Sequence, residues 1–224
     1  MRIRNILLVF GLTALLPFGY ALAQSADVPS ARRIAATTAV ALEEYALGVQ
    51  NGRIDGGAGN DVVRAGRGDD VVAGGPGADV LGAGSGNDAV RGGPGADRMS
   101  GGSGDDTMEG GAGADRMDGG NGRDHMRGGA GRDRLAGGAG VDHIWGEAGD
   151  DFIRGGESGD VLDGGAGDDT IGGDGGRDTI SGGPGNDRID AADRSADRVI
   201  GGPGRDSAQT DPVDRTSSIE RRTG

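Results

Sequence analysis

The sequence predicts an all-β solenoid, because of an internal repeat and an unusual composition. From Gly56 to Asp190 the chain divides without a gap into fifteen nonapeptides, in which the sixth residue is always Asp and the eighth is always apolar. A period this regular indicates a stacked repeat protein. Gly makes up 52 of the 224 residues and aromatic residues only 3%, which argues against an ordinary globular core.

Each position of the nonapeptide has a physical role. Gly recurs at positions one, two and four, where it lets the backbone adopt positive φ and allows carbonyl oxygens to approach one another. The last three residues point outward, inward and outward, as in a short strand. Three residues are too few for a stable strand, so the units must stack into sheets. If successive strands lie on opposite sheets, one coil takes two units, and residues eighteen apart stack about 4.8 Å from each other.

The core of such a solenoid is thin. Each unit of nine residues buries one apolar side chain at position eight, from Val63 to Ile189. Ordering a backbone this rich in Gly costs a large amount of conformational entropy. We therefore predict that metal binding and folding are one event, and that the metal-free chain is largely disordered.

Each unit supplies one candidate metal ligand, the aspartate at position six. Stacked carboxylates form columns of like charge, which need a cation between turns. Because the chain has no Cys, the donors are carboxylate and carbonyl oxygens, a set that suits Ca²⁺ rather than Zn²⁺ or copper. Pairing each of the fifteen units with the unit two further on gives up to about 13 Ca²⁺ sites. The candidate ligands are Asp61, Asp70, Asp79, Asp88, Asp97, Asp106, Asp115, Asp124, Asp133, Asp142, Asp151, Asp160, Asp169, Asp178 and Asp187.

Units such as GGAGNDVVR and GGPGNDRID resemble the G-G-x-G-x-D-x-U-x repeat of the repeats-in-toxin, or hemolysin-type calcium-binding, family. The resemblance implies a parallel β-roll that holds Ca²⁺ between turns on the same side. It also implies that the position-six aspartates and the turn carbonyls are the ligands. Glu147 and Asp174 at position two, Ser158 at position four and the insertion at 191–200 depart from the pattern, so sites there are not implied.

The N-terminal flank predicts export. Residues 1–23 contain a basic start, an apolar stretch and an A-x-A site before Gln24, which is typical of a cleaved signal peptide. A retained membrane anchor is the alternative. We expect no membrane span after cleavage and a secreted, extracellular or periplasmic protein. Members of the family that the repeats resemble usually carry a C-terminal export signal instead.

The remaining segments divide into a cap, a roll and a tail. Residues 24–55 are expected to cap the first coil with a short helix from about Ser30 to Gln50, because the end of a solenoid exposes unpaired strand edges. A loosely tethered linker is the alternative. Residues 56–209 form the calcium-binding repeats. Residues 210–224 are polar and are expected to be a disordered tail.

Charge and motif content narrow the function classes. The formal net charge is −13, and a polyanion would be repelled by it, so nucleic acid is not an expected partner. The glycine-rich turns do not precede a helix, as a phosphate-binding loop requires. The chain also lacks an H-E-x-x-H motif, and 32 residues before the roll are too few for a catalytic domain. We therefore do not expect an enzyme.

Outward positions seven and nine are where a ligand would bind. Arg98, Arg116 and Arg134 recur at eighteen-residue spacing. They form either a cationic ladder that suits an anionic polysaccharide or a solvated face balanced by Asp118 and neighbouring carboxylates. His125 and His143 also stack, either as a transition-metal or pH-sensing pair or as ordinary surface histidines. Trp145 points outward, towards a sugar ring or a neighbouring loop or partner.

The sequence is most consistent with an exported calcium-binding β-roll protein that folds on binding Ca²⁺, with a structural or surface-interaction role. One alternative is a Ca²⁺-dependent carbohydrate-binding or adhesion module for an acidic polysaccharide. Another is the repeat domain of a larger toxin or protease that has lost its effector domain.

Overall fold

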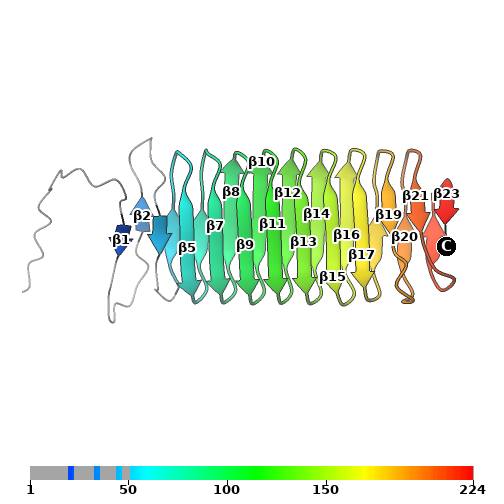
Figure 1. Cartoon of the computed structure of the whole chain (residues 1–224), viewed down its shortest axis with the longest axis horizontal. Helices are drawn as coiled ribbons and strands as arrows, with labels where there is room; N and C mark the ends of the chain where they lie inside the picture. The colour runs from blue at the N-terminus through cyan, green and yellow to red at the C-terminus, as the bar shows by residue number, and fades with distance from the viewer. Residues whose placement is uncertain (1–19, 23–32, 36–43, 47–50, 224) are drawn as a thin grey trace, which may run out of the picture.

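The computed structural model describes residues 20–22, 33–35, 44–46 and 51–223, and these form a parallel β-solenoid (Figure 1). Odd-numbered strands build a 12-stranded sheet and even-numbered strands an 11-stranded sheet, so the chain changes sheet after every strand. This is the all-β parallel β-roll that the sequence predicts. None of the described residues forms a helix of the length and apolarity needed to cross a membrane.

Successive coils stack strand on strand in each sheet. The 12-stranded sheet contains β1 (Tyr20–Leu22), β3 (Glu44–Ala46), β5 (Val62–Arg67), β7 (Val80–Ser85), β9 (Arg98–Ser103), β11 (Arg116–Asn121), β13 (Arg134–Ala139), β15 (Phe152–Glu157), β17 (Thr170–Gly175), β19 (Arg188–Asp190), β21 (Ser207–Gln209) and β23 (Arg221–Thr223). The 11-stranded sheet contains β2 (Arg33–Ala35), β4 (Arg53–Asp55), β6 (Val71–Ala73), β8 (Ala89–Pro94), β10 (Thr107–Ala112), β12 (His125–Ala130), β14 (His143–Ala148), β16 (Val161–Ala166), β18 (Thr179–Ser181), β20 (Arg198–Ile200) and β22 (Arg215–Ser217).

The register between neighbouring strands of the regular repeats is eighteen residues. Met108 on β10 pairs with Met126 on β12, and Met117 on β11 pairs with Leu135 on β13. Every position-eight side chain is buried between the two sheets, with at most 4% of its surface exposed. Two nonapeptides therefore make one coil, and the core is a double row of single apolar side chains, as the period predicts.

The turns depend on glycine because adjacent coils approach closely there. Gly120, at position two, has a φ of 108°, and a Cβ on it would lie 2.9 Å from the carbonyl carbon of Gly102, one coil earlier. The three departures from glycine keep a positive φ, of 75° at Glu147, 64° at Asp174 and 81° at Ser158. These units therefore preserve the turn, at a cost in backbone strain.

Replacing Ser158 with glycine should stabilise the roll. A left-handed backbone costs a residue with a Cβ about 1–2 kcal/mol, whereas the added freedom of glycine in the unfolded chain costs less than about 1 kcal/mol. We expect a net gain of about 0.5–1 kcal/mol in urea unfolding of the calcium-loaded protein. Ser100→Gly is the matched control, because Ser100 lies in a strand without positive φ, and it should lose stability. A loss in both variants would contradict the strain at Ser158.

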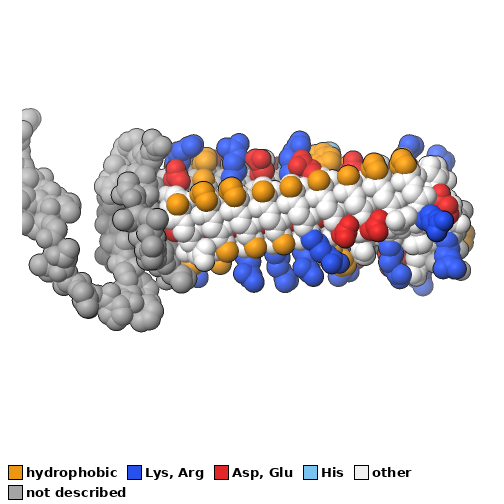
Figure 2. Space-filling view, turned by 90° about the horizontal axis from the view of Figure 1, so that it is seen from above, with side chains coloured by type: hydrophobic (Ala, Val, Ile, Leu, Met, Phe, Trp, Pro, Cys, Tyr) orange, Lys and Arg blue, Asp and Glu red, His pale blue; other side chains and the backbone are white. Residues whose placement is uncertain are grey.

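The two rows of turns differ at position three. One row carries a small hydrophobic residue in every coil, and these residues form the line of hydrophobic side chains along the roll in Figure 2. These exposed residues are Ala58, Pro76, Pro94, Ala112, Ala130, Ala148, Ala166, Pro184 and Pro203. The other row is mostly polar there, with Arg67, Ser85, Ser103, Asn121, Ala139, Glu157, Gly175 and Asp193. Position three therefore offers no ladder of like charges on either row.

The segment expected to form a capping helix contains strands where it is described. Arg33–Ala35 (β2) pairs with β4, and Glu44–Ala46 (β3) pairs with β5, both in parallel. The helix prediction is therefore wrong for these residues. The first regular coil leaves unpaired N–H and C=O groups on both sheets, and a further strand satisfies them where a helix cannot. The other residues between 30 and 50 lie outside the described part.

Most of the predicted signal peptide also lies outside the described residues. Its described part, Tyr20–Leu22, forms β1 and pairs with β3.

The expected disordered tail is ordered where it is described and contains two short strands joined by turns. β22 pairs with β20 and β23 with β21. Asp214 Oδ1 accepts the N–H of Asp197 at 3.1 Å, and Glu220 Oε2 accepts the N–H of Asp206 at 2.6 Å. The acidic residues of the tail thus occupy backbone donors that would otherwise remain open at the C-terminal end of the roll.

Candidate metal centres

The position-six aspartates form two hydrogen-bonded columns inside the roll. Each of them is at most 3% exposed. In each regular pair, Oδ1 of one aspartate accepts the N–H of the aspartate one coil earlier; Asp115 N to Asp133 Oδ1 is 2.8 Å, and Asp133 N to Asp151 Oδ1 is 2.7 Å. One carboxylate oxygen of each residue therefore holds the coils in register.

The second carboxylate oxygen is buried without a hydrogen-bond partner. From Asp70 to Asp206 this holds for Oδ2 of every position-six aspartate. Asp133 Oδ2 lies 2.6 Å, and the Gly146 carbonyl oxygen 2.8 Å, from the point where a Cβ on Gly128 would lie. A carboxylate of one coil and a carbonyl of the next therefore converge beside a position-one glycine.

Three units have alanine in place of that glycine, namely Ala65, Ala83 and Ala191, and all three methyl groups are buried. The space beside the aspartates of these three units thus admits a methyl group, whereas a methyl group on Gly128 would lie 2.6 Å from Asp133 Oδ2. No position-one residue of the repeats is larger than alanine.

The chemistry of these oxygens fits a calcium ion. A buried carboxylate oxygen without a donor carries an uncompensated cost, which a cation would remove. The convergent atoms are carboxylate and carbonyl oxygens, the ligands that Ca²⁺ prefers. No three His, Cys, Asp or Glu side chains form a metal cluster within the described part of the chain. Backbone carbonyls of the glycine turns would therefore have to supply much of the coordination, beside the position-six aspartates.

Burial also changes the acidity of the columns. Removal from water raises the pKa of Asp160, Asp169 and Asp178 to about 7 and that of Asp133 to about 6, although the backbone hydrogen bond to each lowers it in part. Neighbouring carboxylates of the columns raise these pKa values further. In the metal-free roll Asp160, Asp169 and Asp178 are therefore about half protonated near neutral pH, and Asp133 becomes protonated nearer pH 6.

Acidification should stabilise the metal-free roll. Because the folded-state pKa values lie above the value of about 4 in an unfolded chain, the folded state binds more protons between about pH 4 and pH 7, and stability rises as the pH falls through this window. Metal-stripped protein should gain β signal in far-UV circular dichroism between about pH 8 and pH 5. Protons should also weaken Ca²⁺ binding over that range. A loss of β signal on acidification would contradict the raised pKa values.

Comparison with protein families agrees with this geometry. The family model described as RTX calcium-binding nonapeptide repeat (4 copies) matches seven overlapping segments between residues 55 and 208. The chain belongs to the RTX calcium-binding repeat family. The family confirms the resemblance seen in the repeats and identifies this β-roll as a calcium-binding protein. Among curated proteins, no relative matches this RTX protein.

The structure adds two aspartates to the fifteen that the sequence indicates as ligands. Asp197 and Asp206 are buried at 2% and 1% exposure, and each has an unpartnered Oδ2. Their Oδ1 atoms accept the N–H groups of Asp178 at 2.8 Å and Asp187 at 3.0 Å. Asp206 stands at position six of GGPGRDSAQ, so the pattern itself could have found it. Asp197 was hidden by one inserted residue, which the register absorbs as a nineteen-residue step between β18 and β20.

The three ladder arginines lie as the period predicts. Arg98 on β9 pairs with Arg116 on β11, which pairs with Arg134 on β13. All three are exposed, and none of the ion pairs found among the described residues involves them. The outer face of the 12-stranded sheet therefore carries a row of arginines that form no ion pair within the described part of the chain, with the carboxylate of Asp118 exposed on the same face of β11.

The histidines and the tryptophan meet on the opposite sheet. The ring centroids of His125 and His143 are 4.9 Å apart, and that of Trp145 is 5.9 Å from His143. Arg127 lies 4.9 Å above the Trp145 ring and forms an ion pair with Glu147 at 3.3 Å. No third metal-ligating side chain joins the two histidines in the described residues. The group is thus an aromatic patch whose arginine is already engaged.

Proposed function

We propose that this RTX protein is an exported structural element whose β-roll folds when Ca²⁺ neutralises its buried aspartate columns. The observation that supports this most directly is the run of buried Oδ2 atoms without a donor, from Asp70 to Asp206. A structure that left every one of them ionised and unpaired would be strongly disfavoured in a core this thin. In this proposal the ion is part of the fold and the role is structural rather than enzymatic.

In this proposal the two oxygens of each column aspartate have different roles, one in the register of the coils and one in binding the ion. Oδ1 of each aspartate fixes the coil before it through a backbone N–H. Oδ2 and the glycine carbonyls would hold the ion, and bound Ca²⁺ would supply the positive charge that the columns lack. Positive φ at the turn glycines keeps these carbonyls close together. Because each coil is stabilised only by its neighbours, filling one site should favour filling of the next.

Export would give this coupling a purpose. Residues 1–23 have the composition of a signal peptide, and an unfolded chain passes a narrow channel more easily than a folded roll. Extracellular calcium modules bind at about 10⁻⁴–10⁻³ M. On this proposal the protein stays unfolded where free Ca²⁺ is scarce and folds after export.

Far-UV circular dichroism during a Ca²⁺ titration tests the proposal. From chelated protein to about 10 mM Ca²⁺, beyond the weak range of extracellular modules, we expect a cooperative transition from coil to β structure. Mg²⁺ should not reproduce it, because Mg²⁺ demands a stricter octahedral geometry and dehydrates reluctantly. A β spectrum at neutral pH that is unchanged by chelator would overturn the proposal.

A further inference from the structure

The excess negative charge of the described residues is buried inside the roll. Residues 51–221 contain 33 acidic residues and 18 arginines, but 17 of those acids are the buried aspartates of the columns. Their accessible surface therefore carries 18 arginines against 16 acids. Basic side chains project from both long edges of the roll in Figure 2. The net charge of −13 thus gives no ground for excluding an anionic partner, and calcium in the columns would remove the repulsion that remains.

Uncommitted cations gather on the outer face of the 12-stranded sheet. Its position-seven row runs through Arg98, Arg116 and Arg134 and continues directly into Phe152 and then Thr170. Neighbouring strands are about 4.8 Å apart, so this row offers one guanidinium per strand over three strands. Phe152 is 43% exposed, a large apolar ring left open at the end of a cationic row.

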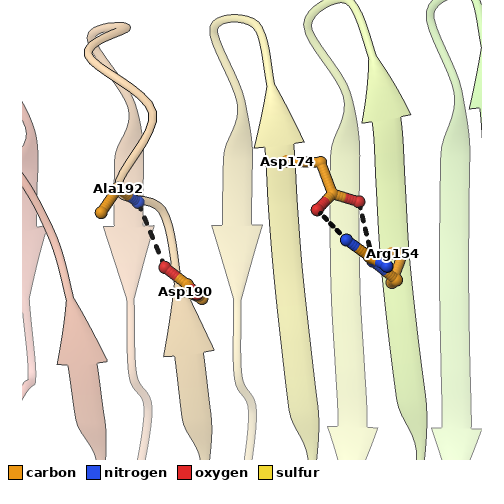
Figure 3. A network of polar contacts seen from close by, with 4 residues as sticks. All are labelled: Arg154, Asp174, Asp190 and Ala192. Carbon is orange, nitrogen blue, oxygen red and sulfur yellow. Dashed lines mark hydrogen bonds and ion pairs between the residues drawn. The ribbon is translucent and has the colours of Figure 1, made fainter.

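A groove opens beside Phe152 where the sheet lacks a side chain. Gly172 lies between Arg154 and Asp190 on successive strands, and the depression is lined by Phe152, Thr170, Gly172 and Arg188 together with these residues. Its edge is fixed, because Arg154 forms two hydrogen bonds with Asp174, one of them 2.9 Å long from Nε to Oδ2 (Figure 3). The groove is therefore preformed and combines an apolar ring with hydroxyl and charged groups.

We propose that this face binds an acidic polysaccharide of the uronate type, with a sugar ring against Phe152 in the groove and carboxylates along Arg98, Arg116 and Arg134. Arginine matches a carboxylate with two parallel hydrogen bonds, and a linked pyranose ring advances a chain by a length comparable with the strand spacing. The inference rests on the proposed function, because the ladder forms only when the coils stack.

Over β8 to β14 the opposite sheet is less suited to such a ligand, and beyond β14 its stacked arginines, Arg198 and Arg215, span only two strands. Arg91 forms an ion pair with Glu109 at 3.2 Å, and Arg127 is held by Glu147 and the Trp145 ring. A carboxylate arriving there would have to displace partners already in place.

Binding of a short oligogalacturonate to the calcium-loaded protein tests the assignment, with its methyl ester as the uncharged comparator. The variant Arg98→Gln/Arg116→Gln/Arg134→Gln should weaken binding about tenfold or more, since three exposed charge pairs are lost. The matched control Arg123→Gln/Arg132→Gln/Arg177→Gln removes the same charge from exposed turns and should change binding by less than about threefold. Phe152→Ala should weaken binding, whereas Val141→Ala, a similarly exposed turn residue, should not.

Three results would overturn the assignment. If the two arginine triples lost binding equally, net charge alone would explain the binding. If the methyl ester bound as tightly as the free acid, the carboxylates of the ligand would not be recognised. If single-stranded DNA bound more tightly, the surface would be a nucleic-acid site. Circular dichroism with Ca²⁺ checks that each variant folds. If the glutamine triple does not fold, a triple of lysines at the same positions replaces it. Lysine keeps the charge and loses only the paired hydrogen bonds, so this variant should still bind less tightly than the parent. If the protein stayed folded and bound the ligand in chelator, the proposal of calcium-driven folding would be wrong and the binding surface would stand. If the folded, calcium-loaded protein did not bind the ligand, the binding surface would be wrong and calcium-driven folding would stand.

Discussion

Gly120→Ala is expected to destabilise the calcium-loaded roll by about 3 kcal/mol, from backbone strain of about 1–2 kcal/mol and overpacking of about 1–3 kcal/mol. Gly120 has a φ of 108°, and the added methyl would press on the Gly102 carbonyl, which one coil cannot move without displacing the next. Because coils are stabilised only by their neighbours, a fault at the centre should separate the two halves. The measurement is urea unfolding monitored by circular dichroism.

Gly82→Ala is the matched control for that experiment. The nearest atom to a Cβ on Gly82 is the Val63 carbonyl oxygen at 3.8 Å, an ordinary contact, and its φ is not in the positive region. Alanine there should be neutral or slightly stabilising, since glycine weakens a strand. If both variants lost the same stability, the close approach of coils at position two would not be the cause.

Asp133→Ala and Asp133→Asn are expected to separate the two roles of a column aspartate. Alanine leaves the buried N–H of Asp115 without an acceptor, at about 1–3 kcal/mol, and removes the metal-facing oxygen. Asparagine keeps an oxygen that can accept the Asp115 N–H but presents an NH₂ group in place of Oδ2. Both variants should need more Ca²⁺ to fold, and only alanine should lower the stability of the metal-free roll at about pH 5.

Asp118→Asn is the control for charge. Asp118 is exposed on β11, so removing its charge should leave the midpoint of the Ca²⁺ titration within about twofold, because exposed charges are screened. An Asp133→Asn variant with an unchanged midpoint would show that Oδ2 does not contribute to calcium binding. The same aspartate would then serve register alone, through the Asp115 N–H.

The nonapeptide period by itself determined the roll, its register and the place of the aspartates. Residues at positions six and eight recur in every unit from Gly56 to Asp190, and a repeat can bury them only by stacking on itself. The pairing of Arg98 with Arg116 follows from the same eighteen-residue step. Local periodicity was enough because nearly every contact in the roll repeats the one before it.

Only the tertiary structure decided what happens at the ends and on the surface. The strands β3 and β22 form outside the repeat because open sheet edges attract any backbone that can pair, a demand that local sequence does not reveal. Stacking buries 17 aspartates, so the excess negative charge is internal. Gly172 has no side chain between two charged neighbours, and a groove opens there. These features depend on which atoms remain uncovered after stacking, and the sequence reports composition without distinguishing covered charge from exposed charge.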